Sequence, residues 1–111
     1  IRGVAMRRLT NRQTGAAVTA LNTFSNKNKT IYGKRDWARG LYVVYSYNDS
    51  WPLYAFDWGL QVWFRNMDFY SVTTSQHLNY AHPETDLPMI DIETVQEMRH
   101  ITQRPTQKRS A

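Results

Sequence analysis

The residues LYVVYSY, at positions 41–47, decide the fold class, because β-branched and aromatic side chains in succession favour an extended strand. Turn-forming residues follow in NDSWP (48–52), and strand-like stretches recur in LYAFD (53–57), QVWFR (61–65) and FYSVTTS (69–75). Short strands separated by short turns are typical of an antiparallel meander. The sequence therefore predicts a four-stranded antiparallel sheet over about residues 41–75.

The residues DIETVQEMRHITQ (91–103) carry the strongest helix signal in the chain. Asp91 is suited to cap the helix at its N-terminus, and Pro105 follows its end. Apolar residues recur between them with helical spacing. A helix over about 92–103 is therefore predicted to pack on the sheet. The expected contact joins Ile92, Val95 and Ile101 of the helix to Val43, Tyr45 and Val62 of the strands, with Met98 beside them on the apolar face.

A second helix is predicted over about 14–24, where Ala17, Leu21 and Phe24 fall on one stripe. Residues 25–40 and 76–90 are predicted to be loops, the first of them basic and punctuated by glycine. The expected fold class is α+β in a single domain, with the C-terminal helix, and the N-terminal one if it forms, covering one face of the sheet. Its parts are a basic N-terminal arm, helix and loop (1–40), the sheet with the C-terminal helix (41–103), and a basic tail (104–111).

Composition limits the classes of protein that this chain can belong to. Its 111 residues suit one ordinary domain. The absence of cysteine excludes disulfides and thiolate metal sites and fits a reducing compartment. No apolar run approaches the ~20 residues that span a bilayer, so a soluble protein without membrane association is expected. Twelve of the fifteen aromatic residues lie in 41–83, and one face of so small a sheet cannot bury them all.

Charge is distributed unevenly along the chain. Residues 1–40 hold nine Lys or Arg and one acid, whereas residues 84–103 hold five acids and one Arg. Basic segments of this kind usually meet phosphate or an acidic protein surface. No recognition-helix pattern, zinc-finger spacing or Gly-rich phosphate loop accompanies the basic residues, so sequence-specific readout is not predicted. The predicted phosphate contacts are Arg7, Arg8, Arg12, Lys27, Lys29, Lys34, Arg35 and Arg39.

The run Thr73-Thr74-Ser75-Gln76-His77 is the most unusual motif. On a strand, Ser75 and His77 would share a face about 7 Å apart, which is too far for a serine to be activated by a histidine. His77 and His82, with Glu84 and Asp86 after them, lack the compact spacing of metal ligands. We therefore predict no catalytic residue, metal or cofactor, and interpret the motif as structural or as a binding element.

Aromatic side chains offer a further contact surface. Rings beside cations are typical of surfaces that hold single-stranded nucleic acid, but Asp49, Asp57 and Asp68 lie among these rings, and acids disfavour phosphate. Most of the rings are therefore expected in the core, with a few left for a partner protein. The predicted partner-binding residues are Trp51, Tyr54, Trp63, Thr73, Ser75 and His77.

Residues 42–83 resemble a group of small bacteriophage-encoded proteins. The resemblance rests on a YVVYSY…WP…W…N…YSVTTSxH…P core, present here from Tyr42 to Pro83. It implies a phage origin and a role in the host cytoplasm during infection or in the virion. It implies no enzymatic activity. One departure is Gln76, where the group leads us to expect Lys or Arg.

Two functions remain open from the sequence. The first is a non-enzymatic phage accessory protein that binds a polyanionic partner, either nucleic acid or a host complex that handles nucleic acid, through the basic N-terminal segment. The alternative is a structural or assembly protein of a virion or large complex. In that case neighbouring chains would order the basic arms, and the aromatic sheet would be a docking face. The oligomeric state is not predicted.

Overall fold

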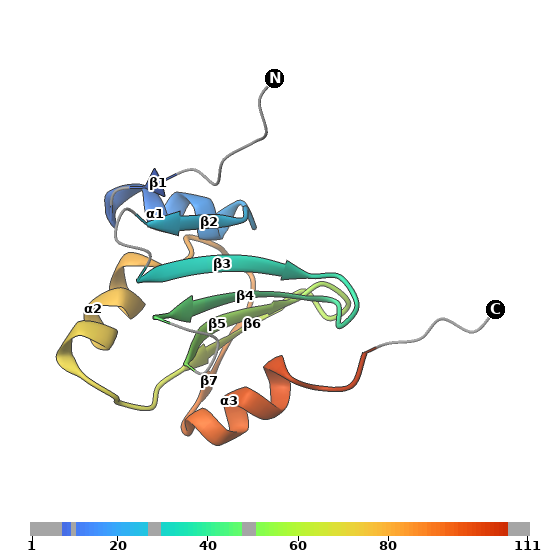
Figure 1. Cartoon of the computed structure of the whole chain (residues 1–111). Coiled ribbons are helices and arrows are strands. Elements are labelled where there is room, and N and C mark those ends of the chain that lie inside the picture. The colour runs from blue at the N-terminus through green and yellow to red at the C-terminus, as the bar shows by residue number, and fades with distance from the viewer. Residues whose placement is uncertain (1–7, 10, 27–29, 48–50, 107–111) are drawn as a thin grey trace.

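The computed structural model describes residues 8–9, 11–26, 30–47 and 51–106. Over these residues the chain is an α+β fold built on one sheet of seven strands, ordered β1 to β7 as in the sequence (Figure 1). Strands β2 to β6 are antiparallel, whereas β1 and β7 each add a parallel edge. The elements are β1 (Arg8–Leu9), α1 (Asn11–Thr19), β2 (Phe24–Asn26), β3 (Ile31–Asp36), β4 (Leu41–Ser46), β5 (Pro52–Asp57), β6 (Val62–Asn66), α2 (Val72–Tyr80), β7 (Met89–Ile92) and α3 (Val95–Thr102).

The α+β class is confirmed, and three of the four predicted strands correspond to β4, β5 and β6. The predicted basic loop 25–40 is wrong, because half of it belongs to β2 and β3. Gly33 makes this pairing possible: a Cβ atom there would lie 2.5 Å from the Tyr42 hydroxyl and 2.6 Å from the Phe24 ring. The missing side chain lets that ring pack over β3 and lets the Tyr42 hydroxyl reach the carbonyl oxygen of Asn22 at 2.7 Å.

The predicted fourth strand, 69–75, is also wrong, since most of it belongs to α2. Ser71 is extended and its Oγ accepts a hydrogen bond from the Thr74 N–H at 3.1 Å, which satisfies one of the free donors of the first turn. Helical spacing then turns Thr74 and His77 inward together. A local cap therefore outweighs the β-branched character of the sequence, and the predicted loop 76–90 begins with half a helix and ends in β7.

The sheet is covered on both faces, not on one. Alternate side chains of β4 and β5, including Tyr42, Val44 and Phe56, pack with α1 and the end of α2. The side chains between them, including Val43 and Ala55, pack with Met98 of α3. In Figure 1, α2 and α3 accordingly lie on different sides of the sheet.

The packing of α3 on the sheet is confirmed for Ile101 against Val43 and Tyr45, and Met98 is buried in the same cluster, but neither Val95 nor Val62 is part of it. The start of the helix was predicted wrongly. Thr94, not Asp91, is the N-cap, and its Oγ1 accepts from the Glu97 N–H at 3.1 Å.

Asp91 and Ile92 belong instead to β7, which pairs with β6 up to Asn66. Within that pairing, Asp91 forms a 2.8 Å ion pair with Arg65. Asp91 and Ile92 therefore extend the sheet as part of β7, and the helix begins only after them.

The N-terminal helix α1 is shorter at its end than predicted. It stops at Thr19 because the Asn22 N–H bonds the Ala17 carbonyl at 2.9 Å and the Leu21 N–H bonds the Val18 carbonyl at 2.9 Å. This pair of bonds is a Schellman motif, and Leu21 takes the left-handed conformation that the motif requires, with φ 59°. None of the helices in the described part of the chain is long and apolar enough to cross a membrane.

Candidate nucleic-acid interface

A pair of tyrosines lies on the face of β3 and β4 beside α3. Tyr32 and Tyr45 are paired across these strands, and their rings stack at 5.4 Å between centroids with 26° between planes. Both rings are half-buried. They share their face with Val43, which is buried under α3, so the pair extends the covered part of the sheet outward.

Lys34 sits over this pair. Its ammonium lies 5.5 Å from the centroid of Tyr32 and 5.7 Å from that of Tyr45, within the range of a cation–π contact. Lys34 is paired with Val43 in the sheet, and its side chain is exposed. The strand thus presents a cation and two aromatic rings together on one surface.

A second aromatic stack lies at the end of the same strands. Trp37, in the turn after β3, stacks on Trp58, in the turn after β5, at 4.6 Å and 11°. Trp37 is 71% exposed. Both turns lie at the same end of the sheet (Figure 1). One indole is therefore held flat against a second ring while most of its surface faces solvent.

A groove of about 340 Å³ joins these features between the β3–β4 hairpin and the end of α3. Its cationic residues outnumber its single acid, and its walls include both aromatic and polar side chains. The lining comprises Lys34, Arg35, Asp36, Trp37, Arg39, Val43, Tyr45, Thr102 and Gln103.

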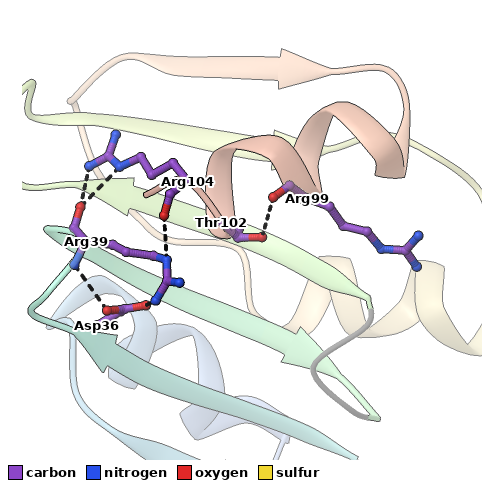
Figure 2. A network of polar contacts seen from close by, with 5 residues as sticks. All are labelled: Asp36, Arg39, Arg99, Thr102 and Arg104. Atoms are coloured by element: carbon purple, nitrogen blue, oxygen red, sulfur yellow. Dashed lines mark hydrogen bonds and ion pairs between the residues drawn. The ribbon is translucent and has the colours of Figure 1, made fainter. Parts of the chain in front are cut away.

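Two arginines clamp the end of this groove (Figure 2). Arg104 Nε and Nη2 donate to the Arg39 carbonyl oxygen at 3.1 and 2.6 Å, and Arg39 Nε donates back to the Arg104 carbonyl oxygen at 2.7 Å. Arg39 also pairs with Asp36 at 3.1 Å, and Arg104 with Asp57 at 2.8 Å. The turn after β3, the end of β5 and the residues after α3 are therefore held as one unit.

The acids that lie among the aromatic rings in the sequence do not carry a free negative charge into the groove where the structure describes them. Burial tends to raise the pKa of the Asp57 carboxyl, but hydrogen bonds from Arg104 and from the Leu60 N–H outweigh burial and hold that pKa below its usual value. Asp57 is therefore ionised and neutralised by Arg104. Asp68 lies beyond the other end of β6, where it accepts from the Val95 N–H at 2.9 Å. Asp49 lies outside the described residues.

The structure brings together only some of the predicted phosphate contacts. Lys34 and Arg39 both line the groove. The Arg35 guanidinium turns to the end of α1, where Nε donates to the Leu21 carbonyl oxygen at 2.9 Å. The remaining predictions cannot be placed in this surface: Arg7, Lys27 and Lys29 lie outside the described residues, as do the side chains of Arg8 and Arg12.

The aromatic residues predicted to contact a partner are divided in the same way. Tyr54 and Trp63 are core residues, 0% and 2% exposed, and they form no part of a surface. Trp51 is half-buried and lies against Tyr70, with 4.9 Å between ring centroids. Trp37 was not among the residues predicted from the sequence. Its position in the turn sequence DWARG was the available signal, because a tryptophan in a short turn is seldom buried in the core.

The threonine–serine–histidine motif has a different arrangement from the one predicted. Thr73 and Ser75 are exposed on α2, whereas His77 is buried and its Nδ1 lies 2.8 Å from Ser46 Oγ of β4. Burial lowers the pKa of His77. Ser46 is itself buried, so this contact attaches α2 to the sheet. Among the residues that the structure describes, no three His, Asp or Glu side chains are grouped closely enough to hold a metal ion.

Comparison with known proteins gives the chain a family but no activity. No curated protein and no solved structure matches it. Residues 19–88, which run from the last residue of α1 to the residue before β7 and include the paired tyrosines and both tryptophan turns, match the model of a family of unknown function, DUF8033. The chain belongs to this family of unknown function.

Proposed function

We propose that the protein binds single-stranded nucleic acid through the aromatic–basic face, which we define as Tyr32, Lys34, Trp37, Arg39 and Tyr45. The observation that carries the proposal is the position of Lys34 above the Tyr32–Tyr45 stack, in the same groove as the exposed Trp37. Surfaces that hold single strands combine cations for the phosphates with rings on which bases stack. This face supplies both within one rigid unit.

A single strand fits the face better than a duplex does. Base–aromatic stacking contributes about 1–3 kcal/mol per base, and it requires bases whose faces are free. A duplex hides those faces inside its own stack and is read by elements that enter its grooves. Trp37 is a flat, exposed ring supported by Trp58, which suits it to stacking and not to groove entry.

The biological setting follows from the resemblance to small phage-encoded proteins. In this proposal the protein is a non-enzymatic phage accessory protein that acts in the host cytoplasm during infection or in the virion. Its partner is nucleic acid itself or a host complex that handles nucleic acid. An acidic protein surface is the alternative occupant of the basic residues.

The test is fluorescence anisotropy of a labelled oligothymidine, titrated with the full chain over a series of salt concentrations. Lys34→Ala removes one phosphate contact, so the slope of log K against log salt should become shallower by about 0.7. Trp37→Ala removes a neutral stacking ring, so affinity should fall by about 1–3 kcal/mol while the slope is unchanged.

A matched control distinguishes this face from general charge. Arg65→Gln also removes one positive charge. Arg65 lies opposite Tyr54 in the register of β5 and β6, so its side chain is on the other face of the sheet, where it donates to Asp91. Its slope should equal that of the parent. The proposal is wrong if Arg65→Gln flattens the slope as much as Lys34→Ala, or if Trp37→Ala binds as tightly as the parent.

A further inference from the structure

Asp57, at the end of β5, is the only Asp or Glu that is buried in the part of the chain that the structure describes. Burying a carboxylate is costly unless it is paired and hydrogen-bonded. Its Oδ1 accepts from the Leu60 N–H at 3.0 Å, and its Oδ2 accepts from Arg104 Nη1 at 2.8 Å. Both oxygens are engaged within the fold, so this carboxylate acts on its neighbours in the chain and not on a ligand.

The turn that follows β5 is built around Asp57. The Asp57 carbonyl oxygen accepts from the Gln61 N–H at 2.8 Å. A Cβ atom on Gly59 would lie 3.3 Å from Asp57 Oδ1, so the chain of this turn passes close over the carboxylate. Trp58, the first residue of the turn, donates from its N–H to the Gly40 carbonyl oxygen at 3.1 Å. The backbone of Trp58 is therefore held from both sides, by the turn around Asp57 and by the neighbouring turn between β3 and β4.

Arg104 joins this turn to the one that carries Trp37. The guanidinium that binds Asp57 also donates to the Arg39 carbonyl oxygen through Nε and Nη2 (Figure 2). Arg39 follows Trp37 in the same turn, and both its N–H and its guanidinium donate to Asp36, the residue before Trp37. The side chain of Arg104 therefore ties together the two turns whose tryptophans stack at 4.6 Å and 11°.

The orientation of the Trp37 indole depends on this arrangement. Trp37 is 71% exposed, so contact with the core cannot hold its ring in place. Its stack on Trp58 gives the ring a fixed plane only while the two turns keep their spacing. A binding surface that is already ordered costs less conformational entropy when a ligand binds. Residues that fix the spacing of the two turns can therefore strengthen stacking without touching the ligand.

We propose that Asp57 and Arg104 are positioning residues of the aromatic–basic face, which hold Trp58 against Trp37 and so fix the plane on which a base stacks. This inference rests on the proposed function and adds two residues that do not belong to the defined face. Their charges neutralise one another in a 2.8 Å ion pair, so neither is assigned a phosphate contact. Loss of the Asp57 carboxylate should therefore weaken the binding of a polyanion, although it makes the protein more positive.

Circular dichroism of the full chain without nucleic acid tests the positioning. Two stacked indoles give an exciton couplet, and Trp37→Ala, which removes the stack, identifies it in the spectrum of the parent. Asp57→Asn and Arg104→Gln should each abolish most of the couplet. Asp91→Asn is the matched control, because Asp91 forms an ion pair of the same 2.8 Å length with Arg65 on the other face of the sheet, and it should keep the couplet.

Oligothymidine binding to the same variants tests the consequence. Asp57→Asn and Arg104→Gln should each lower the affinity by about fivefold or more, the lower end of what one base–aromatic stack contributes. In a Trp37→Ala background the same two changes should cause no further loss, because residues that act through one ring are not additive with it. Arg104→Lys is the milder second variant. It keeps the charge but lacks the planar fork, so the couplet should weaken in it even where Asp57→Asn fails to fold.

The results separate this inference from the proposed function. The inference is overturned if the couplet survives in both Asp57→Asn and Arg104→Lys, if Asp57→Asn binds more tightly than the parent as charge alone predicts, or if the losses in affinity are the same with and without Trp37. If the couplet falls as expected but the parent binds no oligothymidine, the positioning of the indoles stands and the proposed function fails.

Discussion

His77 illustrates how far single residues could be interpreted from the sequence. The motif drew attention to this histidine, but the serine two residues before it in the sequence, Ser75, is exposed on α2. The actual partner is Ser46, 31 residues earlier in the chain. Local spacing cannot indicate a contact that depends on how α2 docks against β4, so the sequence identified the residue but not its role.

His77 should give the stability of the protein a characteristic dependence on pH. Burial lowers the pKa of His77 in the folded state, so the unfolded chain takes up a proton first as pH falls below its value of about 6.5. The free energy of unfolding should therefore decrease from about pH 6.5 down to the lower pKa of the folded state. Urea denaturation at a series of pH values measures this. His77→Gln should reduce the decrease, and an unchanged pH profile in that variant would contradict the assignment.

The strands and helices were predictable where they depend on a strong local pattern. Strands β4, β5 and β6 are rich in aromatic and β-branched residues, and their existence and antiparallel order were predicted correctly. Strand β3, with the sequence IYGKRD, was not predicted because it lacks the alternation of apolar and polar residues that marks a strand. Lys34 and Arg35 are both exposed, although on opposite faces. Helix α2 was missed because nine residues with two adjacent threonines resemble a strand until Ser71 is recognised as a cap.

Helix α3 provides a direct test of the packing on the face of the sheet that carries Val43 and Ala55. Met98 is fully buried against Leu41, Val43 and Ala55, so Met98→Ala should cost about 2–5 kcal/mol of stability. Gln96 is exposed on the same helix, and Gln96→Ala should stay within about 0.5 kcal/mol of the parent. Chemical denaturation compares the two. Equal effects from both substitutions would show that α3 does not pack on the sheet.

The start of α3 is a separate prediction at the scale of the element. Thr94 caps the helix, so Thr94→Ala should cost about 1 kcal/mol. Asp91→Ala removes only a partly exposed ion pair with Arg65, which is worth about 1 kcal/mol at most and is weakened by salt. Repeating the denaturation in high salt distinguishes them: the loss from Thr94→Ala should persist, whereas that from Asp91→Ala should shrink. The reverse result would restore Asp91 as the cap.

At the scale of the whole molecule, the fold arranges charge in a way that the sequence alone did not reveal. The basic N-terminal residues were recognised, but only the sheet register shows that Lys34 and Arg35 serve opposite faces. The acids that argued against a phosphate surface are engaged elsewhere, Asp57 by Arg104 and Asp68 by the start of α3.

The most direct test of the central claim is a competition between single-stranded and duplex nucleic acid for the full chain. Labelled oligothymidine is bound at low salt and then displaced by unlabelled single strand or by a duplex of the same length. The single strand should compete at the lower concentration, and binding should weaken steeply as salt is raised. Absence of binding at low salt, or equal competition by the duplex, would contradict it.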